Sequence, residues 1–296
     1  MGGIAEEVEI LPRRSVLYMP GANERALEKA KGLDADALIL DLEDAVAPDA
    51  KAEARDRVCA AAASGDYGAK EVTIRVNGLT TEWHDADIAA AAKAGPAAVV
   101  VPKVDSVEDV HAIEASLEAG GAPEHTKIWA MVETPMAMLH AEAIAAASER
   151  LIVLVMGTND LAKELQASHV PGRQPLLSGL GLCLLAARAT GKIILDGVYN
   201  DIKDPEGFEA ECLQGAQMGF DGKTLIHPTQ VEPANRTFAP ADDAVDDSRA
   251  LIATFEEAVA AGKGVVTHNG RMIENLHVDN ARRILAVADA IAARQS

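Results

Sequence analysis

Aromatic residues, cysteines and long hydrophobic runs are all scarce in this chain. Aromatic side chains account for 3% of its 296 residues, so the core must be built mainly from the aliphatic residues among the 49% that are hydrophobic. The cysteines Cys59, Cys183 and Cys212 lie far apart, which indicates reduced thiols rather than a disulfide framework. The most apolar short run, residues 151–156, is far shorter than the roughly 20 residues of a membrane-spanning helix. Because the first residues also lack the pattern of a signal peptide, we expect a cytoplasmic protein.

Positive charge is in short supply as well. The chain has 46 acidic residues against 27 basic ones, which gives a formal net charge of −19. Such a surface repels phosphate backbones and anionic lipid, which argues against nucleic-acid and membrane partners. It also repels an anionic small molecule at long range, so a site for such a substrate needs a local source of positive charge.

What the chain does have is a regular series of short apolar runs, most of them followed by an Ala-rich segment of helical character. These segments often begin with Asn, Asp, Thr or Ser, the preferred N-cap residues. The eight runs are residues 15–19, 37–41, 71–76, 98–101, 127–132, 151–156, 193–196 and 222–226. Such runs are typical of strands buried on both faces. The series favours a (β/α)8 TIM barrel over an open doubly wound sheet, although the alternation alone does not exclude the latter.

The character of the sequence changes after residue 238. We therefore assign residues 1–238 to the catalytic barrel and residues 239–296 to a C-terminal appendage of helices and a hairpin. Helices are predicted over 248–262 and 278–293, and a hairpin with strands 264–267 and 271–273 turns at Asn269-Gly270, a pair suited to a two-residue turn. The appendage is too small to be assigned as an independent domain. We expect it to pack on the barrel or to reach a neighbouring subunit.

Charged residues follow several of the predicted strands at the end where barrel enzymes place their chemistry. Glu133 follows the fifth run, Asp160 the sixth, and Arg75 lies near the end of the third. Two carboxylates without His or Cys suit Mg²⁺ rather than zinc. Residues 157–159 would begin a helix whose free N–H groups can bind a carboxylate. Each residue could instead be a helix cap or a rim salt bridge, but the set together predicts a magnesium enzyme acting on a small carboxylate.

Several motifs read together resemble the HpcH/HpaI aldolase and citrate lyase β-subunit family, especially its stand-alone malyl-CoA and citramalyl-CoA lyase branch. The stretch LDLED followed by Ala-Pro is the most specific of them. The matching stretches are RSVLYMPG (14–21), LDLEDAVAP (40–48), RVNG (75–78), VPK (101–103), VET (132–134), MGTND (156–160) and IHP (226–228). They are spread over most of the chain.

The resemblance implies specific roles for residues in these motifs. Glu133 and Asp160 would ligate Mg²⁺, and Arg75 would contact the substrate. Glu43 and Asp44 would act in catalysis by shaping the pocket and holding metal-bound waters. The residues implied to bind the substrate or its coenzyme A moiety are Arg14, Met19, Pro20, Gly21, Gly157, Thr158 and Asn159.

The implied reaction is the reversible cleavage of a 3-hydroxyacyl-CoA into a 2-oxo acid and acetyl- or propionyl-CoA. Malyl-, methylmalyl-, citramalyl- and citryl-CoA all fit this description. Mg²⁺ would acidify the hydroxyl group as a Lewis acid, and Arg75 would offset the charge of the thioester enolate. Many relatives use an Asp from a neighbouring subunit for proton transfer, whereas residues 270–275 place Glu274 at that position. A homotrimer or hexamer is therefore expected.

Three other hypotheses about the function are also compatible with the sequence. The same scaffold could hydrolyse malyl-CoA to malate and free coenzyme A, as a thioesterase. It could be a citrate lyase β subunit that acts on a carrier-linked thioester, or a CoA-ester binding protein without turnover. The acyl group is not readable from the sequence, but residues 166–177 are expected to cover the pocket and select it.

Overall fold

The computed structural model describes residues 11–262 and 266–295. The chain separates into two compact units, which are described one at a time. The barrel unit comprises Arg13–Phe238, and the described residues from Ala239 onward belong to the C-terminal unit.

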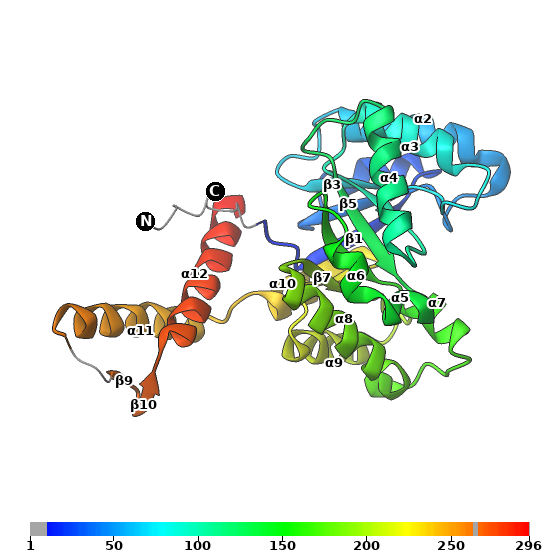
Figure 1. The fold of residues 1–296 in the computed structure, drawn as a ribbon. Helices are drawn as coiled ribbons and strands as arrows, with labels where there is room; N and C mark the ends of the chain where they lie inside the picture. The colour runs from blue at the N-terminus through cyan, green and yellow to red at the C-terminus, as the bar shows by residue number, and fades with distance from the viewer. Residues whose placement is uncertain (1–10, 263–265, 296) are drawn as a thin grey trace. The chain divides into compact units, whose positions relative to one another are not determined.

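The barrel unit contains a closed sheet of eight parallel strands, which confirms the predicted (β/α)8 fold (Figure 1). The strands are β1 (Ser15–Pro20), β2 (Ala37–Asp41), β3 (Glu71–Arg75), β4 (Ala98–Val101), β5 (Lys127–Val132), β6 (Leu151–Met156), β7 (Ile193–Asp196) and β8 (Gly222–Leu225). β1 pairs with both β2 and β8, and this pairing closes the barrel.

Each strand lies between two apolar layers. Val16, Ile39 and Trp129 belong to a buried cluster drawn almost entirely from strand residues, which fills the barrel interior. The alternate residues Leu17 and Leu38 pack in a larger cluster together with residues of the helices. Burial on both faces removes the need for polar residues, which is why the strands appear in the sequence as short continuous apolar runs.

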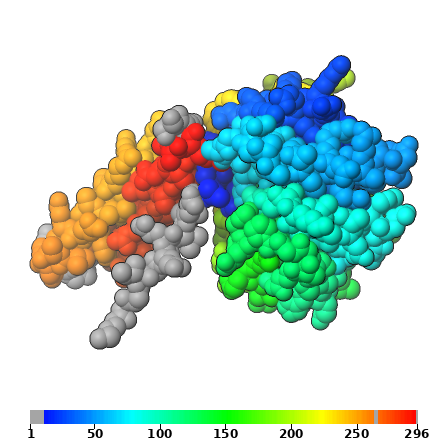
Figure 2. Space-filling model, turned by 90° about the horizontal axis from the view of Figure 1, so that it is seen from above, coloured from blue at the N-terminus to red at the C-terminus, as the bar shows by residue number. Residues whose placement is uncertain are grey.

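Helices cover the outside of the barrel and connect its strands (Figure 1). They are α1 (Glu24–Ala30), η1 (Pro48–Ala50), α2 (Lys51–Ala63), α3 (His84–Ala94), α4 (Val107–Ala119), α5 (Pro135–Leu139), α6 (Ala141–Ala146), α7 (Thr158–Glu164), η2 (Pro171–Leu176), α8 (Leu177–Thr190), α9 (Pro205–Met218), η3 (Pro228–Gln230) and α10 (Val231–Phe238). The start of α4 shows how local sequence sets these bounds, because Ser106 and Asp109 form a reciprocal capping box. Helix α3 packs against both α2 and α4, and the surface that these helices contribute is coloured from light blue to turquoise in Figure 2.

Helix α8 was not predicted. Its interior contains Gly179 and Gly181, which are poor helix formers, and its nearly continuous apolar sequence hides any helical period. A methyl group added at Gly179 would lie 3.3 Å from the Met138 Sδ and 3.5 Å from Leu161 Cδ2. Close packing against neighbouring helices therefore stabilises α8 where intrinsic propensity does not.

Two buried ion pairs lie at the N-terminal end of the barrel. Arg13 Nε and Nη2 donate to the Glu71 carboxylate at 2.6 and 2.8 Å, and Arg14 binds Asp36 in the same two-pronged way at 2.8 and 2.9 Å. Arg13 also lies over the ring of Trp129, 5.5 Å from its centroid. These contacts join the residues before β1 to the start of β3 and to the residue before β2, at the end of the barrel away from the strand C-termini.

The C-terminal unit contains α11 (Asp242–Ala260), the strands β9 (Val266–His268) and β10 (Arg271–Ile273), and α12 (Asn275–Gln295). The predicted turn at Asn269-Gly270 is present, with φ of 49° and 75°. Part of the predicted first strand lies outside the described residues. Helix α11 begins at Asp242, earlier than expected, because acidic residues at a helix N-terminus favour its dipole.

Within the described parts of the chain, no helix combines the length and apolar character needed to cross a membrane.

Candidate active site at the strand C-termini

A cavity of about 380 Å³ opens at the C-terminal ends of the barrel strands, and we call it the rim cavity. Its walls come from segments at the ends of β1, β2, β3, β5, β6 and β8 and from the start of α7. Arg75, Glu133 and Asp160 all line it. The parallel topology thus brings together three side chains that lie as much as 85 positions apart in the sequence (160 − 75 = 85).

Glu133 is held in a fixed position. It follows β5 directly, is 2% exposed, and its Oε1 accepts the backbone N–H of Lys103 at 2.9 Å. Lys103 has a φ of 52°, a strained left-handed conformation for a residue with a side chain. On the other side, Gly157 packs so closely that an added methyl group would overlap the Glu133 carboxylate.

Asp160 projects from the first turn of α7, and its Oδ1 lies 3.5 Å from Lys103 Nζ. Burial raises the pKa of Glu133 to about 8, and the negative charges of Glu43 and Asp160 add to this effect. The pKa of Glu43 is raised to about 7, again chiefly by burial and against the opposing influence of Arg75. The site therefore concentrates more negative charge than its own basic groups offset.

Arg75 is almost completely occupied by protein partners. Its Nε and Nη2 each donate to the Asp41 carboxylate at 2.7 Å, and Nη1 lies 2.7 Å from Glu43 Oε2. The guanidinium also lies over the ring of Tyr18, 4.8 Å from its centroid. Burial opposes its charge, but Asp41 outweighs that effect and the pKa of Arg75 is raised. Arg75 thus has a rigid orientation, yet by itself it does not make the cavity positive.

Asp41 and Tyr18 both orient Arg75, and neither was assigned a role from the sequence. The signal for Asp41 was present, since it ends β2 and begins the LDLED motif. Its role depends on register: Asp41 pairs directly with Arg75 across β2 and β3. Tyr18 was hidden inside an apolar run, where nothing in the sequence indicates which residues face the cavity.

The donors at the rim cavity suit a hard divalent cation. Carboxylate oxygens are the preferred protein ligands of Mg²⁺, and a 2+ ion would offset both the burial and the neighbouring negative charges that raise the pKa of Glu133. Among the residues the structure describes, no group of three or more His, Cys, Asp or Glu is arranged to hold a metal. A site with two protein carboxylates leaves the other coordination positions to water and substrate oxygens. Glu133 and Asp160 are the residues that would hold such an ion.

Of the other predicted site residues, some line the rim cavity and others lie beside it. Pro20, Asp44 and the segment 157–159 line the rim cavity, but the Asp44 carboxylate is 73% exposed and 3.7 Å from Arg75 Nη1. Glu43 contacts Arg75 from beside the cavity. Gly21 packs against the end of β2, where its N–H donates to the Asp41 carbonyl at 2.9 Å. Helix α7 begins at Thr158, as predicted, and is seven residues long.

The structure does not bring Arg14 and Met19 into this site. Arg14 precedes β1 and is bound to Asp36, whereas the cavity lies beyond the other end of the strand, roughly 20 Å away for six residues. Met19 points outward into the layer between strands and helices. We therefore drop both from the proposed site. Glu274 is exposed at the end of the hairpin in the C-terminal unit, and its role stays a prediction.

The contact between Gly157 and Glu133 gives a test of this geometry. Replacing Gly157 by Ala should displace the Glu133 carboxylate and lower kcat/KM by about 100-fold, because small misplacements of reacting groups have effects of this order. Gly181 in α8 is the matched control, since a methyl group there would have no neighbour within 4 Å. Gly181→Ala should keep full activity and unfold at the same or a higher temperature. Equal activity of the two variants would contradict the proposed position of Glu133.

The match to a family model covers residues 14–228 and bears the description HpcH/HpaI aldolase/citrate lyase. The chain is 52% identical over 282 residues to (3S)-malyl-CoA thioesterase of Cereibacter sphaeroides, covering 95% of this chain and 96% of the relative. It is 36% identical over 288 residues to the citrate lyase subunit beta of Escherichia coli K12, covering 96% and 95%.

A solved structure is also similar to this chain. Protein CitE from Mycobacterium tuberculosis, in complex with magnesium, acetoacetate and coenzyme A, superposes with a TM-score of 0.74 at 28% identity, covering 94% of this chain and 98% of that one. The family match spans the strands and the rim cavity described above. This chain therefore belongs to the HpcH/HpaI aldolase/citrate lyase family.

Proposed function

We propose that this protein is an Mg²⁺-dependent enzyme that hydrolyses malyl-CoA to malate and free coenzyme A. The observation that carries the proposal is the rim cavity, where Arg75 is fixed beside the carboxylates of Glu133 and Asp160. The 52% identity to a (3S)-malyl-CoA thioesterase along almost the whole chain supports the choice of acyl group and reaction.

In this proposal, Glu133 and Asp160 bind the metal ion, and Arg75 stabilises negative charge on the substrate. A Mg²⁺ ion on Glu133 and Asp160 would supply Lewis-acid polarisation of the carboxylate and hydroxyl oxygens of the malyl group. Arg75, oriented by Asp41 and Tyr18, points a fixed positive charge toward the thioester oxygen. The acidic environment and the paired Arg75 explain why the protein needs a bound cation to attract an anionic acyl group.

Hydrolysis places negative charge on the thioester oxygen. Water adds to the carbonyl carbon, the oxygen becomes an oxyanion, and the carbon–sulfur bond breaks as the coenzyme A thiolate leaves and takes up a proton. Arg75 stabilises the oxyanion, and a fixed charge in a water-poor site is the kind of contact that contributes several kcal/mol.

Carbon–carbon cleavage by the same site is the second candidate, favoured by the relationship to citrate lyase β subunits. When the hydroxyl group loses its proton, the bond between the hydroxyl-bearing carbon and the CH2 group next to the thioester breaks. The products are glyoxylate and the enolate of acetyl-CoA. Arg75 would stabilise that enolate oxygen, and an acid such as Glu274 would protonate its carbon. The citrate lyase relative is named as a subunit, so action on a carrier-linked thioester is a further variant of this candidate. Assembly as a homotrimer or hexamer also stays a prediction.

One incubation separates these outcomes. Malyl-CoA with protein and Mg²⁺ is expected to release free thiol and malate in equal amounts, without glyoxylate or acetyl-CoA. Glyoxylate and acetyl-CoA in equal amounts would instead establish cleavage. If neither product pair appears with malyl-CoA or with a carrier-linked thioester, the proposed substrate class is wrong.

A further inference from the structure

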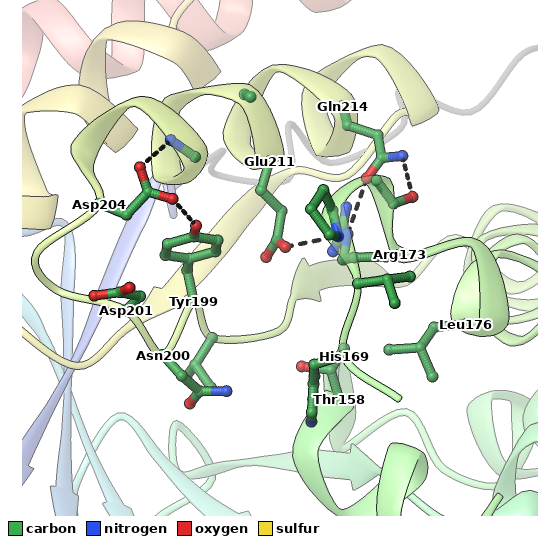
Figure 3. Close-up of a pocket in the computed structure, with 16 residues that line it drawn as sticks. Thr158, His169, Arg173, Leu176, Tyr199, Asn200, Asp201, Asp204, Glu211 and Gln214 are labelled. Atoms are coloured by element: carbon green, nitrogen blue, oxygen red, sulfur yellow. Dashed lines mark hydrogen bonds and ion pairs between the residues drawn. The ribbon is translucent and has the colours of Figure 1, made fainter. Parts of the chain in front are cut away.

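The chain has three tyrosines, and two of them donate their hydroxyl hydrogen to an oxygen of the protein. Tyr67 donates to a backbone carbonyl at 3.3 Å, and Tyr199 donates to the Asp204 carboxylate at 2.6 Å (Figure 3). The Tyr18 hydroxyl lies 3.9 Å from the Met131 Sδ, and a thioether sulfur is a weak acceptor. Among the residues the structure describes, no nitrogen or oxygen accepts the hydrogen of Tyr18. Since polar groups in protein interiors are normally paired, this exception indicates a partner from outside the chain.

Tyr18 lies where a ligand can reach it. It belongs to β1, its side chain is partly buried, and it lines the rim cavity together with Met131 and Glu133. Burial raises the pKa of its hydroxyl well above the usual value, against the opposing influence of Arg75. The hydroxyl therefore keeps its proton at neutral pH. It can donate a hydrogen bond inside the cavity without adding negative charge to a site that already has an excess of it.

The neighbouring Arg75 has few hydrogen-bond donors to spare. Each of its three guanidinium nitrogens already has a carboxylate oxygen at 2.7 Å, two from Asp41 and one from Glu43. Arg75 therefore supplies positive charge to the cavity more readily than it supplies an unshared N–H group. Its guanidinium lies 4.8 Å from the ring centroid of Tyr18, so an unshared O–H donor is available next to that charge.

We propose that the Tyr18 hydroxyl donates a hydrogen bond to the thioester oxygen of the substrate and shares with Arg75 the stabilisation of the oxyanion. This inference rests on the proposed function, in which that oxygen faces Arg75. When water adds to the thioester carbon, the carbonyl oxygen becomes negative and the hydrogen bond from Tyr18 strengthens. The phenol proton stays on Tyr18, while the carbon–sulfur bond breaks and the thiolate leaves. Tyr18 is then a catalytic residue as well as a support for Arg75.

The contact does not depend on which of the two candidate reactions takes place. In carbon–carbon cleavage the same thioester oxygen carries the negative charge of the enolate. A neutral donor serves both intermediates, because in each it makes a stronger hydrogen bond to the charged oxygen than to the carbonyl of the substrate. The role of Tyr18 can therefore be tested separately from the identity of the products.

Tyr18→Phe removes a single oxygen atom and keeps the ring over which Arg75 lies. It should lower kcat by about 10–100-fold, less than the loss of a charged group, because neutral hydrogen bonds are roughly half as strong as charged ones. KM for malyl-CoA should change much less than kcat. The variant should unfold at the same or a higher temperature, because its hydroxyl has only a weak sulfur partner in the fold. Initial rates of thiol release and thermal unfolding measure the two effects.

Tyr199→Phe is the matched control and should show the opposite pattern. Tyr199 and Asp204 line a separate cavity of about 410 Å³, and Tyr199 is not among the residues that line the rim cavity (Figure 3). Loss of its paired hydroxyl should lower the unfolding temperature by about 2–4 °C and leave kcat unchanged. If Tyr18→Phe keeps the kcat of the parent, or if both variants lower it equally, the inference is wrong. A lower unfolding temperature of Tyr18→Phe with unchanged kcat would assign the hydroxyl to the fold alone.

Binding without turnover separates this inference from the proposed function. Acetyl-CoA carries the thioester oxygen and free coenzyme A does not, so calorimetry with both ligands isolates the contact. Tyr18→Phe should weaken acetyl-CoA about fivefold relative to coenzyme A, the usual effect of one neutral hydrogen bond. If malyl-CoA is not turned over but this selective loss is found, the proposed function fails and the contact of Tyr18 stands. If the variant weakens both ligands equally, or weakens neither, the inference fails.

Discussion

Glu133→Gln is expected to lower kcat/KM for malyl-CoA by about 10²–10³-fold, because the proposed Lewis-acid contribution is several kcal/mol and each 1.36 kcal/mol is a factor of ten. Glutamine keeps the shape of the side chain and can still accept the Lys103 N–H that Glu133 accepts at 2.9 Å. The loss would therefore be a loss of charge at the metal site. Initial rates of thiol release over a range of Mg²⁺ concentrations measure it, and the variant should need more Mg²⁺ for half-maximal activity.

The same substitution should not weaken the fold. Burial and the nearby charges of Glu43 and Asp160 disfavour a charged Glu133, so a neutral side chain relieves repulsion in the absence of metal. The metal-free variant should unfold at the same or a higher temperature than the metal-free parent, as often found where function maintains an unfavourable charge. Glu142→Gln, an exposed position on α6, is the control and should change neither quantity. Full activity of Glu133→Gln, or turnover by the parent after complete chelation of divalent ions, would rule out the proposed metal site.

Arg75→Lys is expected to reduce kcat/KM by about 10²–10³-fold, the usual effect of removing one group that stabilises an oxyanion. Lysine keeps a positive charge but lacks the planar fork that binds both oxygens of Asp41 at 2.7 Å and lies over Tyr18. The charge then loses its fixed direction toward the thioester oxygen. The effect should appear mainly in kcat, which saturation kinetics with malyl-CoA would show.

Arg13→Lys provides a matched control for this prediction. Arg13 makes an equivalent two-pronged buried pair with Glu71, at 2.6 and 2.8 Å, and also lies over an aromatic ring, but it is at the N-terminal end of the barrel. Removing a partner of a buried pair typically costs about 3–5 kcal/mol, so each lysine variant should lose part of that stability in denaturant unfolding. Only Arg75→Lys should also lose activity. If the folded fractions of both variants have the activity of the parent, Arg75 has no role in catalysis.

The rim cavity is not the positively charged site that the composition led us to expect. The net charge of −19 led us to expect a local positive site for an anionic substrate, with Arg75 and the helix start at residues 157–159 as the candidates. In the structure Asp41 and Glu43 already neutralise Arg75. The cation that attracts the substrate is therefore proposed to be Mg²⁺ itself, which makes binding as well as turnover dependent on the metal.

The order of apolar runs in the sequence favours a barrel and predicts the group of residues at its rim. The apolar runs are buried on both sides, so each marks a strand, and the polar residues after them must converge because parallel strands end together. Arg75, Glu133 and Asp160 follow this rule, and all three line one cavity. The sequence also identified the turn at Asn269-Gly270, because that dipeptide tolerates the positive φ angles required there.

Which side of each strand faces the cavity depends on contacts across the whole fold. A run that is apolar on both faces has no alternation, so the sequence did not show that Tyr18 faces the site while Met19 faces the helices. Register decided that Asp41 lies opposite Arg75, and packing of Gly179 against Met138 stabilised an unpredicted helix. These features depend on contacts between residues far apart in the chain, and such contacts leave no local pattern in the sequence.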